Sequence, residues 1–300
     1  MKTSVSTAPT RGHPDPKRGP YRVLLRDDAA YPGRLRALEM APAVLYVCGC
    51  WDDQVPAVAI VGARAASGER QALARQMARA AVRLGHGVVS GGAIGIDAAA
   101  HRGALDARGP TCVVLGTGID VVYPQRHAAL YAAIVRQGGS LISSFPLGTP
   151  PKPWHFPARN RLIAALVDVV VVVEAGLLSG SRFTAEAAVR LGKPVLAVPG
   201  SPGTDALLLS GASSVRGAED LVERLRHPAM PSSDPPVEQE APDLQKVRAA
   251  LGRVPQDLSE LSLRAGLPPA ACAAAVLNLE LLGACLRVAG GRFIALDHRS

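Results

Sequence analysis

Short apolar runs alternate with helical patterns through the middle of the chain. Strands that are buried on both faces of a sheet have the same nearly continuous hydrophobicity. The stretches between the runs, such as residues 68–84 and 185–191, repeat their apolar positions with helical spacing. This alternation predicts βαβ units, and therefore an α/β fold with a doubly wound, mostly parallel sheet. The runs are Val58–Val61, Gly87–Ser90, Thr111–Leu115, Ser140–Ser143, Asp168–Val173 and Pro194–Val198.

The two ends of the chain have other patterns. Residues 1–20 are polar and mainly basic, which predicts a disordered tail, and residues 21–49 indicate a short helix followed by a strand at Val44–Cys48. Residues 227–242 hold five prolines and no apolar periodicity, so we predict a linker there. The domain before it then covers residues 21–226.

A small C-terminal domain follows the predicted linker. Three helical segments are indicated: one over Asp243–Leu251, one beginning at Asp257 with Ser259 as a partial cap, and one from Pro268 to Leu282. Two short apolar runs then flank Gly290-Gly291, which suits a hairpin. Three helices and a hairpin are the plan of a winged helix, which we predict over residues 243–300.

Composition and charge narrow the class of partner. The 300 residues are 48% apolar and 19% charged, with a formal net charge of +8, which favours an anionic partner. No apolar run is long enough to cross a bilayer, so we expect no membrane association. The five cysteines fit no disulfide framework and no zinc spacing, and we interpret them as reduced thiols of a cytoplasmic protein.

Glycine, serine and arginine gather where the predicted strands end. Small residues let the backbone approach a phosphate closely, and the N-terminus of a following helix offers free N–H groups. The carboxyl ends of parallel strands share one edge of the sheet, so we expect a single anion-binding rim. Its candidate residues are Gly62, Arg64, Ser67, Ser90, Gly91, Gly92, Gly95, Gly116, Gly118, Ser179, Gly180 and Ser181.

Residues 152–161 combine cations with rings in a chain that is only 4% aromatic. Proteins that bind single-stranded nucleic acid use cations for phosphates and rings for stacking on bases. A competing interpretation makes Trp154 and Phe156 a seal at the sheet edge, with Asn160 and Arg161 capping the helix that follows Pro157. The candidate ligands of nucleic acid in this segment are Lys152, Phe156, Arg159, Asn160 and Arg161.

The remaining polar pairs form no recognisable catalytic set. Asp97 and His101 are four residues apart on a predicted helix, and we interpret them as a helix-face hydrogen bond, because two ligands are too few for a metal. Glu174 and Asp97 stand at neighbouring strand or helix ends, so acid–base catalysis on a bound nucleotide stays an open alternative. No nucleophile–base pair stands out, so we expect no catalytic residue, metal or cofactor.

Taken together, these motifs resemble the DNA-processing protein A (DprA/Smf) family. The resemblance covers about residues 21–225, and the segment after the linker resembles the winged-helix extension of that family. The matching motifs are Tyr31-Pro32, Ile60–Arg64 with Ser67, Val88–Asp97 with His101, Leu115–Asp120 with Tyr123-Pro124, His155–Pro157 with Arg159–Arg161, Glu174-Ala175, Ser179–Ser181 and Val198–Gly200.

The resemblance implies a function as well as a fold. Members of the family have an extended Rossmann-like domain, bind single-stranded DNA without being enzymes, form homodimers and load the recombinase RecA on incoming DNA during natural transformation. The chain departs from the pattern at two positions: Ile94 stands where the family usually has Arg, and Ser144 where it usually has Glu. The first change removes one DNA-facing cation.

Two other classes of function stay open at this stage. Phosphoribohydrolases that cleave nucleoside monophosphates share the general fold, although their Pro-Gly-Gly-x-Gly-Thr loop is not found here. A nucleotide-sensing or partner-docking module is the other alternative, and Ile94 in place of Arg keeps it open.

Overall fold

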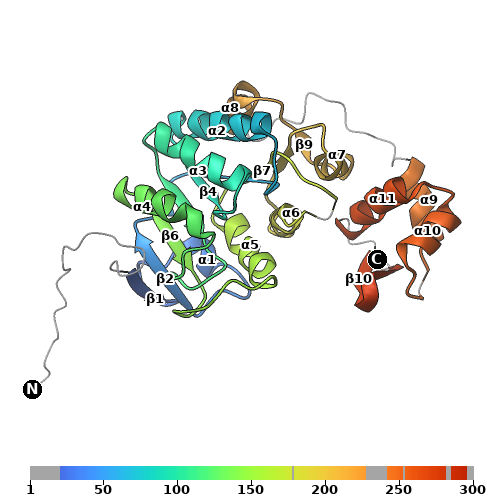
Figure 1. The fold of residues 1–300 in the computed structure, drawn as a ribbon, viewed down its shortest axis with the longest axis horizontal. Coiled ribbons are helices and arrows are strands. Elements are labelled where there is room, and N and C mark those ends of the chain that lie inside the picture. Colours follow the sequence, from blue (N-terminus) through green and yellow to red (C-terminus); the bar gives the residue numbers. More distant parts are fainter. Residues whose placement is uncertain (1–20, 178, 228–241, 253, 282–284, 296–300) are drawn as a thin grey trace, which may run out of the picture.

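The computed structural model describes residues 21–177, 179–227, 242–252, 254–281 and 285–295. They form a nine-stranded sheet with helices on both faces, followed by a small unit of three helices and a two-stranded hairpin (Figure 1). This confirms the predicted α/β class with a mostly parallel sheet and a winged helix after it. The predicted tail and nearly all of the predicted linker lie outside the described residues.

The order of strands in the large sheet is β1-β2-β6-β5-β4-β3-β7-β8-β9. All neighbours from β6 to β9 are parallel, whereas β2 pairs antiparallel with both β1 and β6. The bounds are β1 (Tyr21–Leu25), β2 (Val44–Gly49), β3 (Ala57–Val61), β4 (Gly87–Ser90), β5 (Thr111–Val114), β6 (Ser140–Ser143), β7 (Val169–Val172), β8 (Val195–Ala197) and β9 (Ser213–Ser214).

The interpretation of residues 21–49 as one helix and one strand was incomplete. Tyr21–Leu25 is the edge strand β1, and the helix α1 is reduced to Gly33–Arg36. Val23, Leu24 and Leu25 are apolar, yet only Leu24 is buried, as expected of a strand at the edge of a sheet. The strand is formed by antiparallel pairing with β2, a partner that the sequence of residues 21–25 alone does not indicate.

The direction of the strand order reverses at β3. From β3 the chain builds β4, β5 and β6 on one side, then crosses back to place β7 on the other side of β3. The loops after the neighbouring strands β3 and β7 therefore lead away from each other, which opens a crevice at the carboxyl edge of the sheet. Ligands of doubly wound folds bind at such a switch point.

Alternate residues of each strand face opposite layers of helices. In β3, Ala57, Ala59 and Val61 belong to the cluster under α1, α5, α6 and α7, whereas Val58 and Ile60 belong to the cluster under α2, α3 and α8. The further bounds are α2 (Gly68–Arg83), α3 (Ile96–Asp106), a 3-10 turn η1 (Gln125–His127), α4 (Ala128–Arg136), α5 (His155–Ala165), α6 (Ser181–Arg190), α7 (Pro202–Leu209) and α8 (Ala218–Arg226).

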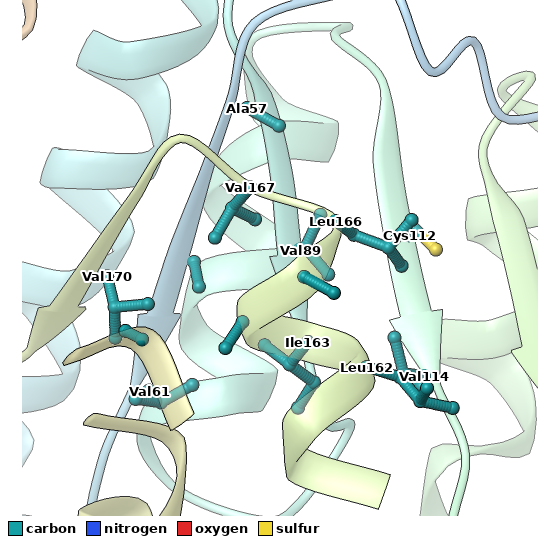
Figure 2. Packing of buried hydrophobic residues seen from close by; sticks show 14 of the residues in the cluster. Ala57, Val61, Val89, Cys112, Val114, Leu162, Ile163, Leu166, Val167 and Val170 are labelled. Atoms are coloured by element: carbon teal, nitrogen blue, oxygen red, sulfur yellow. The ribbon is translucent and has the colours of Figure 1, made fainter. Parts of the chain in front are cut away.

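Helix α5 is fixed on the sheet by its C-terminal half. Leu162, Ile163 and Leu166 lie against Cys112 and Val114 of β5 and their neighbours (Figure 2). The side chains of Leu162, Ile163 and Leu166 are at most 1% exposed. This packing sets the position of the first turn of α5, where the aromatic and cationic segment begins.

The C-terminal unit has a buried core of its own, which includes Val247, Leu261, Cys272 and Phe293. Its elements are α9 (Pro242–Ala250), α10 (Leu258–Ala265), α11 (Pro269–Leu281), β10 (Cys285–Val288), a 3-10 turn η2 (Ala289–Gly291) and β11 (Arg292–Ala295).

The expected cap of the second helix was wrong. Asp257, not Ser259, caps α10: its carboxylate accepts from the Glu260 N–H at 2.8 Å, and the Glu260 carboxylate accepts from the Asp257 N–H at 3.0 Å. This reciprocal pair is a capping box, and it satisfies two donors where a serine two positions later satisfies neither.

Candidate nucleic-acid interface

Two adjacent hollows lie at the carboxyl edge of the sheet. The larger, about 450 Å³, is formed by the loops after β3, β4 and β7 and by the first turns of α5 and α6. The smaller, about 110 Å³, is formed by the loops after β4 and β5 with Tyr123-Pro124 and Arg126. Arg64, Ala93, Phe156 and Arg159 line both hollows. The switch point predicted from the topology is therefore occupied by one continuous candidate site.

A wider groove of about 700 Å³ runs between α2 and α8. Its charged side chains are of mixed sign, with Arg79 and Arg83 on α2 against Glu219 and Glu223 on α8. It is lined by the C-terminal half of α2, away from the glycine loops, and we therefore place the candidate site at the two hollows.

The loop after β3 presents one exposed arginine. The Arg64 guanidinium lies 5.1 Å from the centre of the Phe156 ring, in cation–π contact. Behind it, Ser67 is occupied as the N-cap of α2: its hydroxyl accepts from the Arg70 N–H, and its own N–H donates to Glu174 Oε2 at 3.3 Å. Arg64 is thus available to an anion, while Ser67 and Glu174 hold the loop.

The loop after β4 is held by hydrogen bonds on several sides. Asp97 Oδ2 accepts from the N–H groups of Gly91 and Ala93, at 3.1 and 3.3 Å. The Gly92 carbonyl accepts from Tyr131 Oη at 3.0 Å and contacts His127 Nδ1 at 2.9 Å. The buried Ser90 hydroxyl donates to the Ile60 carbonyl. These contacts fix the shape of the loop.

Arg159 is a buried cation beneath both hollows. It is 4% exposed, and its Nη1 donates to the carbonyls of Gly91 and Val114. Burial lowers the pKa of Arg159 to about 10, opposed by the nearby carboxylate of Asp97, so the guanidinium stays charged at neutral pH. Burial also raises the pKa of Asp97, against the effect of Arg159. Both side chains form a hydrogen bond with the backbone of Gly91, which links α3 and α5 to the loop after β4.

Phe156 lines both hollows. Its ring packs on Gly116, where an added Cβ would lie 2.8 Å from Cδ1 of the ring, and its centre is 5.7 Å from that of Tyr123. The side chain is half-buried. Next to it, Asn160 donates from Nδ2 to the Gly180 carbonyl at 3.0 Å, which links α5 to the turn before α6.

The structure gathers most, but not all, of the predicted site residues. The ones lining a hollow are Gly62, Arg64, Gly91, Gly92, Gly116, Phe156, Arg159, Asn160, Ser179, Gly180 and Ser181. The ones lining neither are Ser67, Ser90, Gly95, Gly118, Lys152 and Arg161. Of these, Lys152 is exposed and lies over Trp154, with its Nζ 5.4 Å from the ring centre.

The sequence-based set omitted several side chains that line the hollows, among them Thr117, Tyr123, Arg126 and Thr184. Tyr123-Pro124 was visible as a motif after the third strand, and Arg126 follows it directly. Ile94 lines the same small hollow as Arg126. A cation therefore reaches this hollow from the turn before α4, although the residue at position 94 is apolar.

The chemistry available at the hollows is binding by cations, N–H groups and rings. Throughout the described residues, no group of three or more His, Cys, Asp or Glu side chains is placed to hold a metal ion. Asp97 and His101 do not form the expected helix-face hydrogen bond. Asp97 accepts from N–H groups of the loop after β4, and His101 contacts the Thr111 hydroxyl at 2.8 Å. Among the helices that the structure describes, none is long and apolar enough to cross a membrane.

The sequence matches two family models along most of its length. The model described as DNA recombination-mediator protein A matches residues 22–226, and the DprA winged helix domain matches residues 231–291. The chain belongs to the DNA recombination-mediator protein A (DprA) family. The resemblance drawn from the motifs is therefore confirmed.

Relatives of known name support the assignment to the DprA family. Protein Smf of Escherichia coli is 35% identical over 290 residues, covering 90% of this chain and 76% of that protein. A putative DNA processing protein DprA of Mycobacterium tuberculosis is 40% identical over 288 residues, covering 87% of this chain and 74% of that protein.

Two solved DprA structures share the fold. DprA of Streptococcus pneumoniae superposes with a TM-score of 0.62 at 36% identity, covering 68% of this chain and 74% of that one. A Helicobacter pylori DprA, whose structure concerns its single-stranded DNA binding mode, superposes with a TM-score of 0.64 at 30% identity, covering 71% of this chain and 98% of that one.

Proposed function

We propose that this DprA-family chain binds single-stranded DNA across the two hollows. The observation that carries the proposal is the ring of Phe156, which lines both hollows together with the exposed cation Arg64, while the exposed Arg126 lines the smaller hollow. Single-strand binding needs cations that follow the backbone and a ring on which a base stacks. The Helicobacter pylori relative is described as binding single-stranded DNA, which supports the same ligand here.

Each group has a separate role in this proposal. Arg64 and Arg126 bind phosphates through their guanidinium groups. Phe156 stacks on a base. Arg159 and Asp97 act through the loop after β4, because their polar atoms are bonded to it. None of these groups recognises a base edge, so sequence preference will be weak.

The biological role that we propose is recombination mediation without catalysis. The chain would load a RecA-type recombinase on incoming single strands in natural transformation, in the cytoplasm and as a homodimer. The family description as a recombination mediator supports the first part of this proposal. A direct test is the rate at which RecA forms filaments on single strands covered by a single-strand binding protein, with and without this chain.

The experiment that tests the binding proposal compares three ligands across a salt series. We expect tight binding of a single-stranded oligonucleotide, weaker binding of a duplex of the same sequence, and little binding of a mononucleotide. Equal affinity for mononucleotide and oligonucleotide would favour a nucleotide sensor instead. Release of free base from a nucleoside monophosphate, abolished by Glu174→Gln, would establish an enzyme and overturn the non-catalytic role.

A further inference from the structure

Helix α11 of the winged helix is covered on two faces. Cys272, Val276 and Leu279 belong to the core of the small domain. Leu277 lies on a different face of the helix and is not part of that core, yet it is only 4% exposed. Helix α7 of the large domain runs beside α11 (Figure 1). The second covered face of α11 therefore lies against the large domain.

A buried ion pair anchors the same contact. Arg182 of α6 places Nη2 at 3.2 Å from Oε2 of Glu280 on α11, and both side chains are 11% exposed. Nε of Arg182 lies 3.0 Å from Oε1 of Glu186, one turn further along α6. One guanidinium thus lies between two carboxylates, one from each domain. Breaking such a pair on one side leaves a poorly solvated charge, so the contact depends on both partners.

The composition of α11 is poor for DNA and suitable for a protein surface. Glu280 is its one charged residue, and the rest are Ala, Leu, Val, Pro, Cys and Asn. Helices that enter a DNA groove present cations and amides to phosphates and base edges. Glu280, the anionic residue that contacts Arg182, would be repelled by DNA phosphates and is attracted by a cation on a protein surface.

We propose that the winged helix of this chain is an intramolecular docking module, in which α11 binds the α6–α7 face of the large domain with Arg182–Glu280 as its polar anchor. Residues 228–241 join the two domains covalently, and a connection of this length keeps the domains at an effective concentration on the order of millimolar. Even a weak contact between α11 and the large domain is therefore formed, with no need for a second contact elsewhere. The contact can be tested separately from the single-strand proposal, because none of the winged-helix residues that the structure describes lines either hollow.

Docking also steadies part of the DNA site. Helix α6 carries Arg182 and Glu186 toward the winged helix, while Ser181 and Thr184 of the same helix line the larger hollow. A helix held on one side by α11 presents its other side to the hollow in a fixed position. The winged helix is then a support for the site rather than a second DNA reader.

Charge reversal in the full-length chain tests the docking. Arg182→Glu and Glu280→Arg each destroy the pair, and we expect each to speed amide hydrogen exchange in α11 about tenfold, a coupling within the range for residues in contact. The radius of gyration from small-angle scattering should rise in both. The double variant Arg182→Glu/Glu280→Arg keeps one cation between two carboxylates, and we expect it to restore both measurements. Arg190→Glu is the matched control, since Arg190 also pairs with Glu186, at 3.8 Å, but is 78% exposed.

The outcomes separate cleanly from a folding defect. Glu280→Arg changes only the small domain, so the unfolding transition of the large domain should stay in place. Unchanged exchange and scattering in both single variants would overturn the docking, as would a double variant no better than the singles. A gain of duplex DNA affinity in the two single variants would instead overturn the role of the winged helix as a support, by showing that α11 is a DNA-binding helix that docking keeps covered.

Discussion

At the scale of single residues, the site separates cations that are free to bind from a cation that is already bound. Arg64 and Arg126 are exposed at the hollows, whereas Arg159 is buried with its donors on backbone carbonyls. A change at an exposed cation should therefore affect phosphate binding, and a change at Arg159 should affect the loop that it supports.

Replacement of an exposed cation should lower both affinity and its dependence on salt. For Arg64→Ala and Arg126→Ala we expect the slope of log K against log salt to flatten by about 0.7 each, the contribution of one neutralised phosphate on a single strand. Lys152→Ala, exposed beyond the hollows, belongs to the same series. Arg83→Ala is the control, because Arg83 is exposed at the far end of α2. Fluorescence anisotropy at several salt concentrations measures the slopes, and a salt-independent affinity would remove the phosphate-binding interpretation.

Loss of the Phe156 ring should weaken binding without unfolding the protein. Stacking on one base contributes about 1–3 kcal/mol by alanine substitution, whereas a buried core Phe contributes about 3–5 kcal/mol to stability. The ring is only half-buried, so we expect Phe156→Ala to lose about tenfold or more in affinity with a nearly unchanged melting temperature and salt slope. A drop of many degrees with normal binding by the folded fraction would instead make Phe156 a core residue.

His101 should make stability depend on pH. Burial lowers the pKa of His101 to about 3, so the folded protein keeps the ring neutral at pH values where the unfolded chain takes up a proton. The stabilisation of the folded state by the neutral His101 ring is complete above about pH 6.5. Below that pH the free energy of unfolding falls by up to about 1.4 kcal/mol per pH unit. We expect His101→Gln to reduce this slope in denaturant titrations between pH 7 and 4. An unchanged slope in His101→Gln would contradict the assignment.

At the scale of elements, the hollows exist because loops approach each other without side chains between them. Gly95, the N-cap of α3, has φ +81°, and a Cβ there would lie 2.4 Å from the Ala63 carbonyl oxygen. The loops after β3 and β4 are therefore in direct backbone contact, which places Arg64 beside the small hollow.

An alanine at Gly95 should disturb the site more than the same change elsewhere. Gly138 has a similar φ of +86° but open space around it, so Gly138→Ala isolates the backbone strain, about 1–2 kcal/mol. Gly95→Ala adds a collision with two carbonyls, so we expect a larger loss of unfolding free energy together with weaker oligonucleotide binding. Urea denaturation of both variants provides the comparison. Equal losses would show that the close approach of the loops is relaxed at no cost.

At the scale of the whole molecule, the large domain has buried clusters on both faces of its sheet and the winged helix has a separate one. We expect a chain ended at residue 227 to keep its affinity for single-stranded DNA within about threefold, because α11 offers no cation and phosphate contacts supply most of such affinity. Anisotropy titrations of the shortened and full-length chains measure the difference. A collapse of affinity would mean that the winged helix binds DNA itself.

Local sequence determined the parts of this protein that depend on neighbours along the chain. Apolar runs such as Val169–Val172 are buried on both faces and required parallel strands, and glycines at their ends required the loops. The motifs were enough to identify the family. Local patterns also gave α2 and the winged-helix elements, because their periodicity or turn signals lie within one segment.

Tertiary structure decided which side chains meet, and that depends on distances that no local pattern contains. The edge strand β1 needed its partner β2, and Arg126 reached the small hollow only because the turn before α4 passes it. Arg159 has the same residue type as Arg64, yet packing of α5 buries it near Asp97, with its Nη1 donating to the carbonyls of Gly91 and Val114. Burial is a property of the assembled layers, so charge and spacing along the chain could not distinguish the two arginines.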